Sequence, residues 1–235
     1  MDEYLTLARE QWELNKTLLN TSCHICFYGP PATGKTKTSL QIRGGFRVPM
    51  TEDTPAAELR GHFIPAEGGG FKWHDGPAVK SMRMGTATTI DEIDKAGGDA
   101  LAMMLAIADT TPEITLPTNE TITAEEGFCI TATTNARPSA LSPALRDRFL
   151  WVEVLWPNPA ALNGIAHQYQ RAARRDLYSP RSDNEPNRFT VRDWMRLSHL
   201  TNEIGQDNAI TAVVGPDNER EFKLSLELGG SRADA

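Results

Sequence analysis

A glycine-rich octapeptide near the N-terminus constrains this chain more than any other feature. It reads Gly29-Pro30-Pro31-Ala32-Thr33-Gly34-Lys35-Thr36 and satisfies the pattern G-x-x-x-x-G-K-[ST]. The short apolar run at residues 24–28 predicts a buried strand before it, and a helix is expected to begin near Lys35. A strand, a glycine-rich loop and a helix in this order predict a phosphate-binding loop in an α/β fold.

The residue types in this loop suit nucleotide phosphates. Successive backbone N–H groups can converge as an anion nest, Gly34 lets the chain approach the phosphates, and the helix N-terminus adds its positive dipole end. Lys35 supplies a mobile positive charge, and the Thr36 hydroxyl can ligate Mg²⁺. We predict that residues 29–36 bind ATP. The alternative is a chance match in a loop rich in glycine and proline, which the flanking elements disfavour.

Two adjacent carboxylates, Asp91 and Glu92, end another predicted strand at residues 87–91. At a strand end beside a phosphate loop, an aspartate can hold Mg²⁺ and a following glutamate can polarise the attacking water. We therefore predict Asp91 and Thr36 as metal ligands and Glu92 as the catalytic base. Adjacent acids are common on loops, but together with the phosphate loop they favour hydrolysis over nucleotide binding alone. For Asp94 we expect only a favourable interaction with a helix dipole.

A third polar position follows the predicted strand at residues 128–133. The amide of Asn135 could orient the attacking water or touch the γ-phosphate. A turn-forming asparagine that caps the strand is the alternative.

Strand-like and helical patterns alternate along the first two thirds of the chain. The predicted strands are residues 24–28, 47–50, 87–91, 128–133 and 151–155. Such alternation predicts a P-loop NTPase fold with a five-stranded parallel sheet covered by helices. Beyond Pro157 and Pro159 the patterns are helical, at residues 160–176 and 190–202. We predict a nucleotide-binding α/β domain at 1–157, including an N-terminal helix, and a small helical lid domain with a C-terminal tail at 158–235.

The composition restricts the partners. A formal net charge of −7 disfavours a phosphate backbone as ligand, although Arg171, Arg174 and Arg175 could line one basic helix face. Three cysteines, Cys23 and Cys26 among them, are too few for a disulfide framework and lack the second pair of a zinc site. No apolar stretch approaches the roughly 18 residues of a membrane span, and the first residues do not resemble a signal peptide. We expect a cytoplasmic protein without membrane contact.

The order of these motifs resembles the AAA+ ATPases, in particular the MoxR and dynein-related branch that includes the cobaltochelatase ATPase subunit and the CbbQ/NorQ activators. The acidic motif continues as Asp91-Glu92-Ile93-Asp94-Lys95-Ala96, where the family usually has Asn-Arg at the positions of Asp94 and Lys95. Residues 132–135 are similar to the sensor 1 pattern, and residues 141–149 to the segment with an arginine finger. Between the phosphate loop and the acidic motif, residues 71–85 contain the family's Trp and Gly-Pro.

The resemblance implies further features. AAA+ ATPases form rings, usually homo-hexamers, in which an arginine of one subunit reaches the neighbour's nucleotide, and we choose Arg148 over Arg146 for this role. Arg192 is similar to the sensor 2 arginine of the lid. The family remodels proteins, often with a partner that has a von Willebrand factor A domain or with a metal-chelation enzyme. Two inserts, residues 61–76 and a predicted hairpin at 113–123, are expected either to face the substrate or to pack within the ring.

Three functions remain open on the sequence. The first is a ring-forming, magnesium-dependent ATPase that remodels or activates a protein partner. The second is a nucleic-acid-dependent motor on the same core, which the acidic charge disfavours. The third is an assembly switch that binds nucleotide and turns over little.

Overall fold

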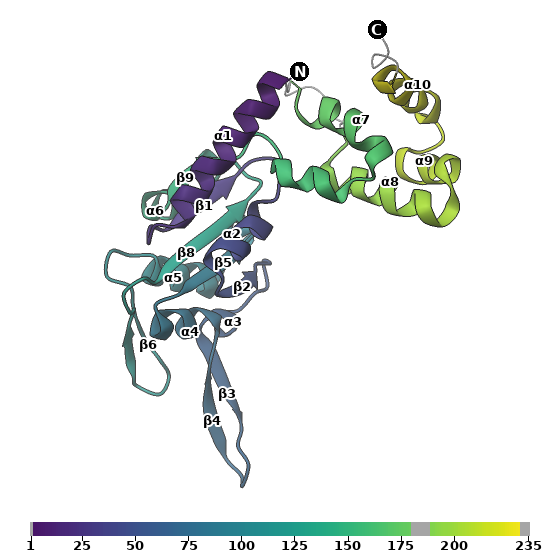
Figure 1. Cartoon of the computed structure of the whole chain (residues 1–235). Coiled ribbons are helices and arrows are strands. Elements are labelled where there is room, and N and C mark those ends of the chain that lie inside the picture. Colours follow the sequence, from purple (N-terminus) through teal and green to yellow (C-terminus); the bar gives the residue numbers. More distant parts are fainter. Residues whose placement is uncertain (1, 180–188, 231–235) are drawn as a thin grey trace. The chain divides into compact units, whose positions relative to one another are not determined.

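The structure is a computed structural model that describes residues 2–179 and 189–230. The chain forms two compact units (Figure 1). One comprises residues 1–13, 30–34 and 155–235, and the other comprises residues 14–29 and 35–154. Helix α1 (Asp2–Leu19) begins in the first unit and ends in the second.

The larger unit is built on a five-stranded sheet with the strand order β2-β5-β8-β1-β9. All neighbouring strands in it are parallel. The strands are β1 (Ile25–Tyr28), β2 (Phe46–Pro49), β5 (Ala87–Asp91), β8 (Cys129–Thr134) and β9 (Leu150–Glu153). Each lies within two residues of its predicted bounds, so the predicted P-loop fold with a five-stranded parallel sheet is confirmed.

Helices cover both faces of this sheet. All six residues of β8 are buried, as expected for a central strand with no solvent-facing side. Helix α2 (Lys35–Arg43) contacts β5 and β8, and α4 (Pro77–Met84) contacts β2 and β5. Helix α5 (Gly98–Ile107) adds Met104 and Ile107 to the same core. Shorter elements complete the unit: α3 (Ala56–Arg60), η1 (Ile93–Lys95), η2 (Pro138–Ala140) and α6 (Pro143–Arg148).

Two antiparallel hairpins are inserted into the larger unit. The predicted hairpin at 113–123 is present as β6 (Glu113–Thr115) and β7 (Thr121–Thr123). The insert at 61–76 also forms a hairpin, β3 (Gly61–Pro65) and β4 (Phe71–Asp75), which Figure 1 shows extending away from the sheet. Its tip holds three glycines with positive φ at residues 68–70, where the backbone turns back on itself.

The smaller unit is helical. It contains η3 (Pro159–Gly164), α7 (His167–Leu177), α8 (Val191–Ile204), α9 (Gln206–Val214) and α10 (Glu219–Gly230). Trp194, Tyr169 and Leu197 are fully or almost fully buried in its core. A capping box fixes the start of α8, since Thr190 and Asp193 bond each other's backbone N–H groups at 3.3 and 3.0 Å. The predicted helical lid is therefore present.

One predicted helix was wrong in extent. The pattern at 160–176 predicted a continuous helix, but the chain forms η3, leaves helical geometry at Ile165 and Ala166, and then begins α7. The break places the Ile165 side chain in the helical core, where it is 2% exposed. Residues 180–188 of the predicted lid domain, and the end of the predicted tail, lie outside the described residues.

Helix α1 is divided between the two units. The first turns of α1 group with the helical unit because Leu5 and Ala8 are buried in the same cluster as Trp194. Among the described residues, no helix is both long and apolar enough to cross a membrane.

Candidate functional site

The glycine-rich loop adopts backbone geometry that its glycines make possible. Gly29 has φ of +130°, and a Cβ there would lie 2.4 Å from the carbonyl oxygen of Val154, the residue directly after β9. Gly34 has φ of +99° directly before α2 begins at Lys35. Any other residue at Gly29 would therefore face both backbone strain and a clash.

Lys35 joins the loop to the third predicted motif. Its Nζ donates to the carbonyl oxygen of Gly29 at 2.9 Å and to Oδ1 of Asn135 at 3.1 Å. The residue is 7% exposed, and burial lowers the pKa of its ammonium to about 8, against the opposing attraction of Asp91. Two of the predicted site residues, Lys35 and Asn135, thus lie within hydrogen-bond distance of each other.

Asp91 is the most heavily bonded carboxylate of the site. Its Oδ1 accepts hydrogen bonds from Thr36 Oγ1 at 2.7 Å and from Thr133 Oγ1. Its Oδ2 accepts from the guanidinium of Arg47 at 2.5 Å. Burial raises the pKa of Asp91, but the two hydroxyls and Arg47 outweigh burial and hold it below the usual value. The side chain is therefore ionised at neutral pH.

The arrangement suits a hard divalent cation. Magnesium prefers carboxylate, hydroxyl, phosphate and water oxygens, and the Thr36 hydroxyl and the Asp91 carboxylate lie side by side. Within the described part of the chain, no three His, Cys, Asp or Glu side chains form a metal-binding group. Phosphate oxygens and water would have to complete the coordination, as is usual where Mg²⁺ binds with a nucleotide.

Glu92 follows directly and is held by a neighbour. Its backbone is left-handed, with φ of +59°, and its Oε2 lies 2.6 Å from Nζ of Lys95. Both side chains are about half exposed, at 44% and 49%. The predicted base is therefore accessible to solvent and engaged in an ion pair.

Asp94 behaves differently from the expectation. Its Oδ1 accepts a hydrogen bond of 2.5 Å from Thr134 Oγ1, so it connects the acidic motif to the end of β8. The same hydroxyl accepts from the backbone N–H of Ala136, next to Asn135. Asp94 thus supports the turn that carries Asn135.

Sequence reasoning missed Arg47, Thr133 and Thr134 at this site. Each faces the acidic motif because β2, β5 and β8 are neighbours in the sheet. Thr133 ends the strand predicted at 128–133 and Thr134 directly follows it, so their position at a strand end was a usable signal. Nothing in the local pattern indicated that Arg47 on β2 would reach Asp91.

The predicted finger Arg148, its rejected alternative Arg146 and the predicted sensor Arg192 make no hydrogen bond to Asp91 that the structure describes. Arg148 is bonded to its own surroundings: Nε to the carbonyl oxygen of Leu105 at 2.9 Å, and the guanidinium to Ala144 O and Asp109 Oδ2, each at 3.0 Å. Arg146 is exposed on the same helix. Arg192 is exposed on the first turn of α8, in the helical unit.

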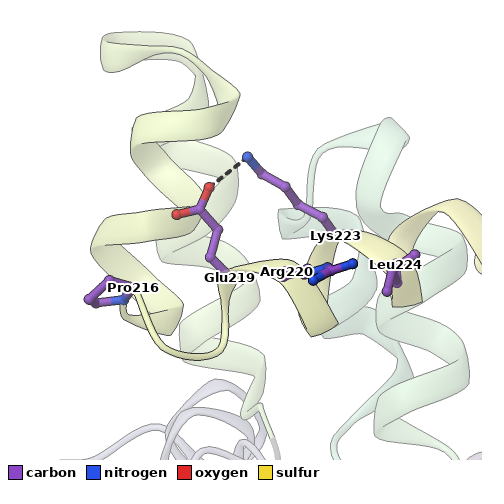
Figure 2. A pocket seen from close by; sticks show the side chains of 5 residues that line it. All are labelled: Pro216, Glu219, Arg220, Lys223 and Leu224. Atoms are coloured by element: carbon purple, nitrogen blue, oxygen red, sulfur yellow. Dashed lines mark hydrogen bonds and ion pairs between the residues drawn. The ribbon is translucent and has the colours of Figure 1, made fainter.

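A cavity of about 420 Å³ lies elsewhere, at the start of α10 (Figure 2). It is lined by Pro216, Glu219, Arg220, Lys223 and Leu224. Lys223 is already paired with Glu219 and with Asp207, each at 2.6 Å. None of these residues belongs to the predicted site.

The structure has the features of a P-loop nucleotide-binding ATPase. A phosphate loop precedes α2, an aspartate accepts a hydrogen bond from the loop threonine, and the sheet is parallel. The family model described as the AAA domain of the dynein-related subfamily matches residues 24–149. The chain therefore belongs to this family, the AAA+ ATPases of the MoxR type.

The relatives agree with this assignment. Protein NorQ of Paracoccus denitrificans is 30% identical over 142 residues, 56% of this chain and 52% of NorQ. The uncharacterized protein SH1500 of Staphylococcus haemolyticus is 28% identical over 184 residues, 71% of this chain and 68% of that protein. NtrX of Brucella abortus, solved with ADP, shares the fold at a TM-score of 0.55 and 15% identity, over 83% of this chain and 50% of NtrX. The chain thus spans only about half the length of NorQ and NtrX.

Proposed function

We propose that this protein hydrolyses ATP with Mg²⁺ as part of a homo-hexameric ring that remodels or activates a protein partner. The hydrolytic part rests on two hydrogen bonds made by consecutive residues: Lys35 donates to Asn135, and Thr36 donates to Asp91. These residues come from the phosphate loop and two adjacent strands. Their convergence supports nucleotide chemistry at this edge of the sheet.

Each residue has a distinct part in the proposal. The backbone of residues 29–34 and the ammonium of Lys35 bind the phosphates, and Asn135 orients the attacking water. Glu92 accepts a proton from that water. Thr36 and Asp91 would hold Mg²⁺, which neutralises the charge that develops on the phosphate oxygens.

The ring and the partner rest on family membership. Relatives include NorQ, the denitrification regulatory protein NirQ of Stutzerimonas stutzeri, and midasin of Giardia intestinalis, of which the matched region is 4%. We propose a protein partner, such as one with a von Willebrand factor A domain, rather than nucleic acid, because the chain has a net charge of −7. The free cysteines Cys23, Cys26 and Cys129 suit a reducing compartment, so we place the protein in the cytoplasm.

Two arginines compete for the role of the finger that enters a neighbouring site. Family position favours Arg148, but its guanidinium already has three partners within the subunit. Arg146 is exposed on the same helix. Arg192 is proposed to report the nucleotide state to the helical unit.

The test is the rate of ATP hydrolysis per protomer, measured over a wide range of protein concentration. For a ring with shared sites, the rate should rise with concentration and fall roughly a thousandfold in either Arg148→Ala or Arg146→Ala. Glu92→Gln should reduce it by about a hundredfold or more at every concentration. Arg175→Ala, an exposed arginine on α7, serves as the control. A rate independent of concentration and of both finger variants would exclude the ring.

A second function, the assembly switch with little turnover, is favoured by one observation. Lys95 holds Glu92 in an ion pair of 2.6 Å, which leaves the base less free to accept a proton. In that case Glu92→Gln would match the low turnover of the wild type, while nucleotide would still drive assembly.

A further inference from the structure

Arg47 forms a contact that no motif of the site predicts. It lies on β2, the edge strand beside β5, and its guanidinium is 2.5 Å from Oδ2 of Asp91. The Asp91 side chain is 15% exposed, whereas that of Arg47 is 50% exposed. A half-exposed cation therefore covers the carboxylate that is proposed to hold the metal.

With this contact, both carboxylate oxygens of Asp91 accept hydrogen bonds. Oδ1 is taken by the hydroxyls of Thr36 and Thr133, and Oδ2 is taken by Arg47. A divalent cation that approaches Asp91 directly must compete with a short, charge-assisted hydrogen bond. It also meets the electrostatic repulsion of the guanidinium.

For a cation that binds together with ATP, the favourable and unfavourable contributions to the binding free energy differ. The phosphates supply further oxygen ligands and bring negative charge, both of which offset the loss of the Arg47 contact. Because the Arg47 side chain is half exposed, water can solvate its guanidinium when it leaves Asp91, which lowers the cost of displacement. Displacement of Arg47 is thus favourable only when metal and nucleotide bind together.

We infer that Arg47 is a positioning residue that acts as a resident counter-cation, excluding divalent cations from Asp91 in the nucleotide-free protein and releasing Asp91 when the metal arrives with ATP. This inference rests on the proposed function in one respect, namely that Asp91 holds the metal. It goes beyond that function by assigning the order of binding to a residue outside the conventional motifs.

The experiment is a titration with Mn²⁺ alone, followed by electron paramagnetic resonance of the free ion, on the full chain without nucleotide. Wild type, Arg47→Gln and Arg196→Gln are compared. Arg196 is the matched control because it is an exposed arginine paired with an aspartate, Asp193, at 3.4 Å. Circular dichroism should show the same fold for all three, since both arginines are half exposed or more.

We expect Arg47→Gln to bind Mn²⁺ at least about threefold more tightly than wild type, because the competing ion pair is gone. Arg196→Gln should match wild type. With saturating ATP the difference between Arg47→Gln and wild type should shrink, since Arg47 is then displaced in wild type and is absent from the variant. Asp91→Asn introduced into Arg47→Gln should abolish the gain.

Equal Mn²⁺ affinities of Arg47→Gln and wild type without nucleotide would overturn the inference while leaving the proposed ATPase intact. If wild type with ATP bound Mn²⁺ in a manner that Asp91→Asn did not weaken, Asp91 would not be a metal ligand. That result would overturn the metal site of the proposed function as well as the role of Arg47.

Discussion

At the scale of single residues, the burial of Lys35 opposes the positive charge that its proposed role requires. The phosphates need its positive charge, yet the ammonium is 7% exposed and burial lowers its pKa to about 8. Its Nζ donates to two uncharged oxygens, those of Gly29 and Asn135. The charge state of Lys35 is therefore sensitive to pH just above neutrality.

The first prediction is a pH dependence of nucleotide binding. Below pH 8 Lys35 is charged, so the affinity for nucleotide should be nearly constant. Above pH 8 the free protein must take up a proton to bind nucleotide, so this affinity should fall by up to about tenfold per pH unit. A fluorescent ATP analogue titrated between pH 7 and 9.5 measures this. Glu92→Gln should show the same profile. A flat profile to pH 9.5 would contradict the lowered pKa.

The same pKa affects stability with a defined sign. The folded-state pKa of about 8 lies below the ordinary 10.5, so between these values the unfolded chain binds more protons than the folded one. The cost of burying the charged ammonium is complete below pH 8 and is relieved as pH rises toward 10.5. Lys35→Met should remove this contribution to the pH dependence of unfolding.

At the scale of elements, one arginine connects the two inserted hairpins. Arg83 on α4 pairs with Glu120 of the β6–β7 turn through two bonds of 2.7 Å and with Asp75 of β4 at 2.9 Å. Asp75 also accepts from the indole of Trp73 at 2.7 Å. Since a bidentate arginine pair restricts geometry, the two hairpins are held to α4 by one side chain.

We predict that Arg83→Ala loosens both hairpins together. Amide hydrogen exchange in β3–β4 and in β6–β7 should accelerate roughly two- to fivefold, as the loss of exposed ion pairs allows, while exchange in β8 stays unchanged. Lys72→Ala on β4 is the matched control, because Lys72 is exposed and has no part in the Arg83 group. Acceleration confined to one hairpin would show that Arg83 does not couple them.

At the scale of the whole molecule, two separate cores stabilise the chain. Ile90 and Met104 lie in the core of the sheet, and Leu197 and Trp194 lie in the core of the helical unit. The two clusters share no residue. Each unit therefore has its own source of stability.

We predict that core truncations act on one unit at a time. Ile90→Ala and Leu197→Ala remove fully buried side chains and should each cost about 2–5 kcal/mol. Hydrogen exchange measured by mass spectrometry should show Leu197→Ala weakening α7 to α9 and sparing β5 and β8, with the reverse for Ile90→Ala. Equal weakening of both units by either variant would show a single cooperative structure.

The sequence alone determined the elements and the motif residues of this protein. The strand–loop–helix at residues 24–43 and the carboxylates after β5 were predicted because local patterns specify strands, turns and phosphate loops over short distances. The β3–β4 hairpin was missed because its glycine-rich tip obscured two short strands.

Only the tertiary structure decided which side chains meet. Strand order places Arg47 on β2 and Thr133 on β8 on either side of Asp91 on β5, and it ties Asp94 to Thr134. The packing of α5 against α6 likewise brings Asp109 to Arg148. These contacts join residues about 40 positions apart, and pairings of that range depend on how the whole sheet assembles rather than on any local pattern.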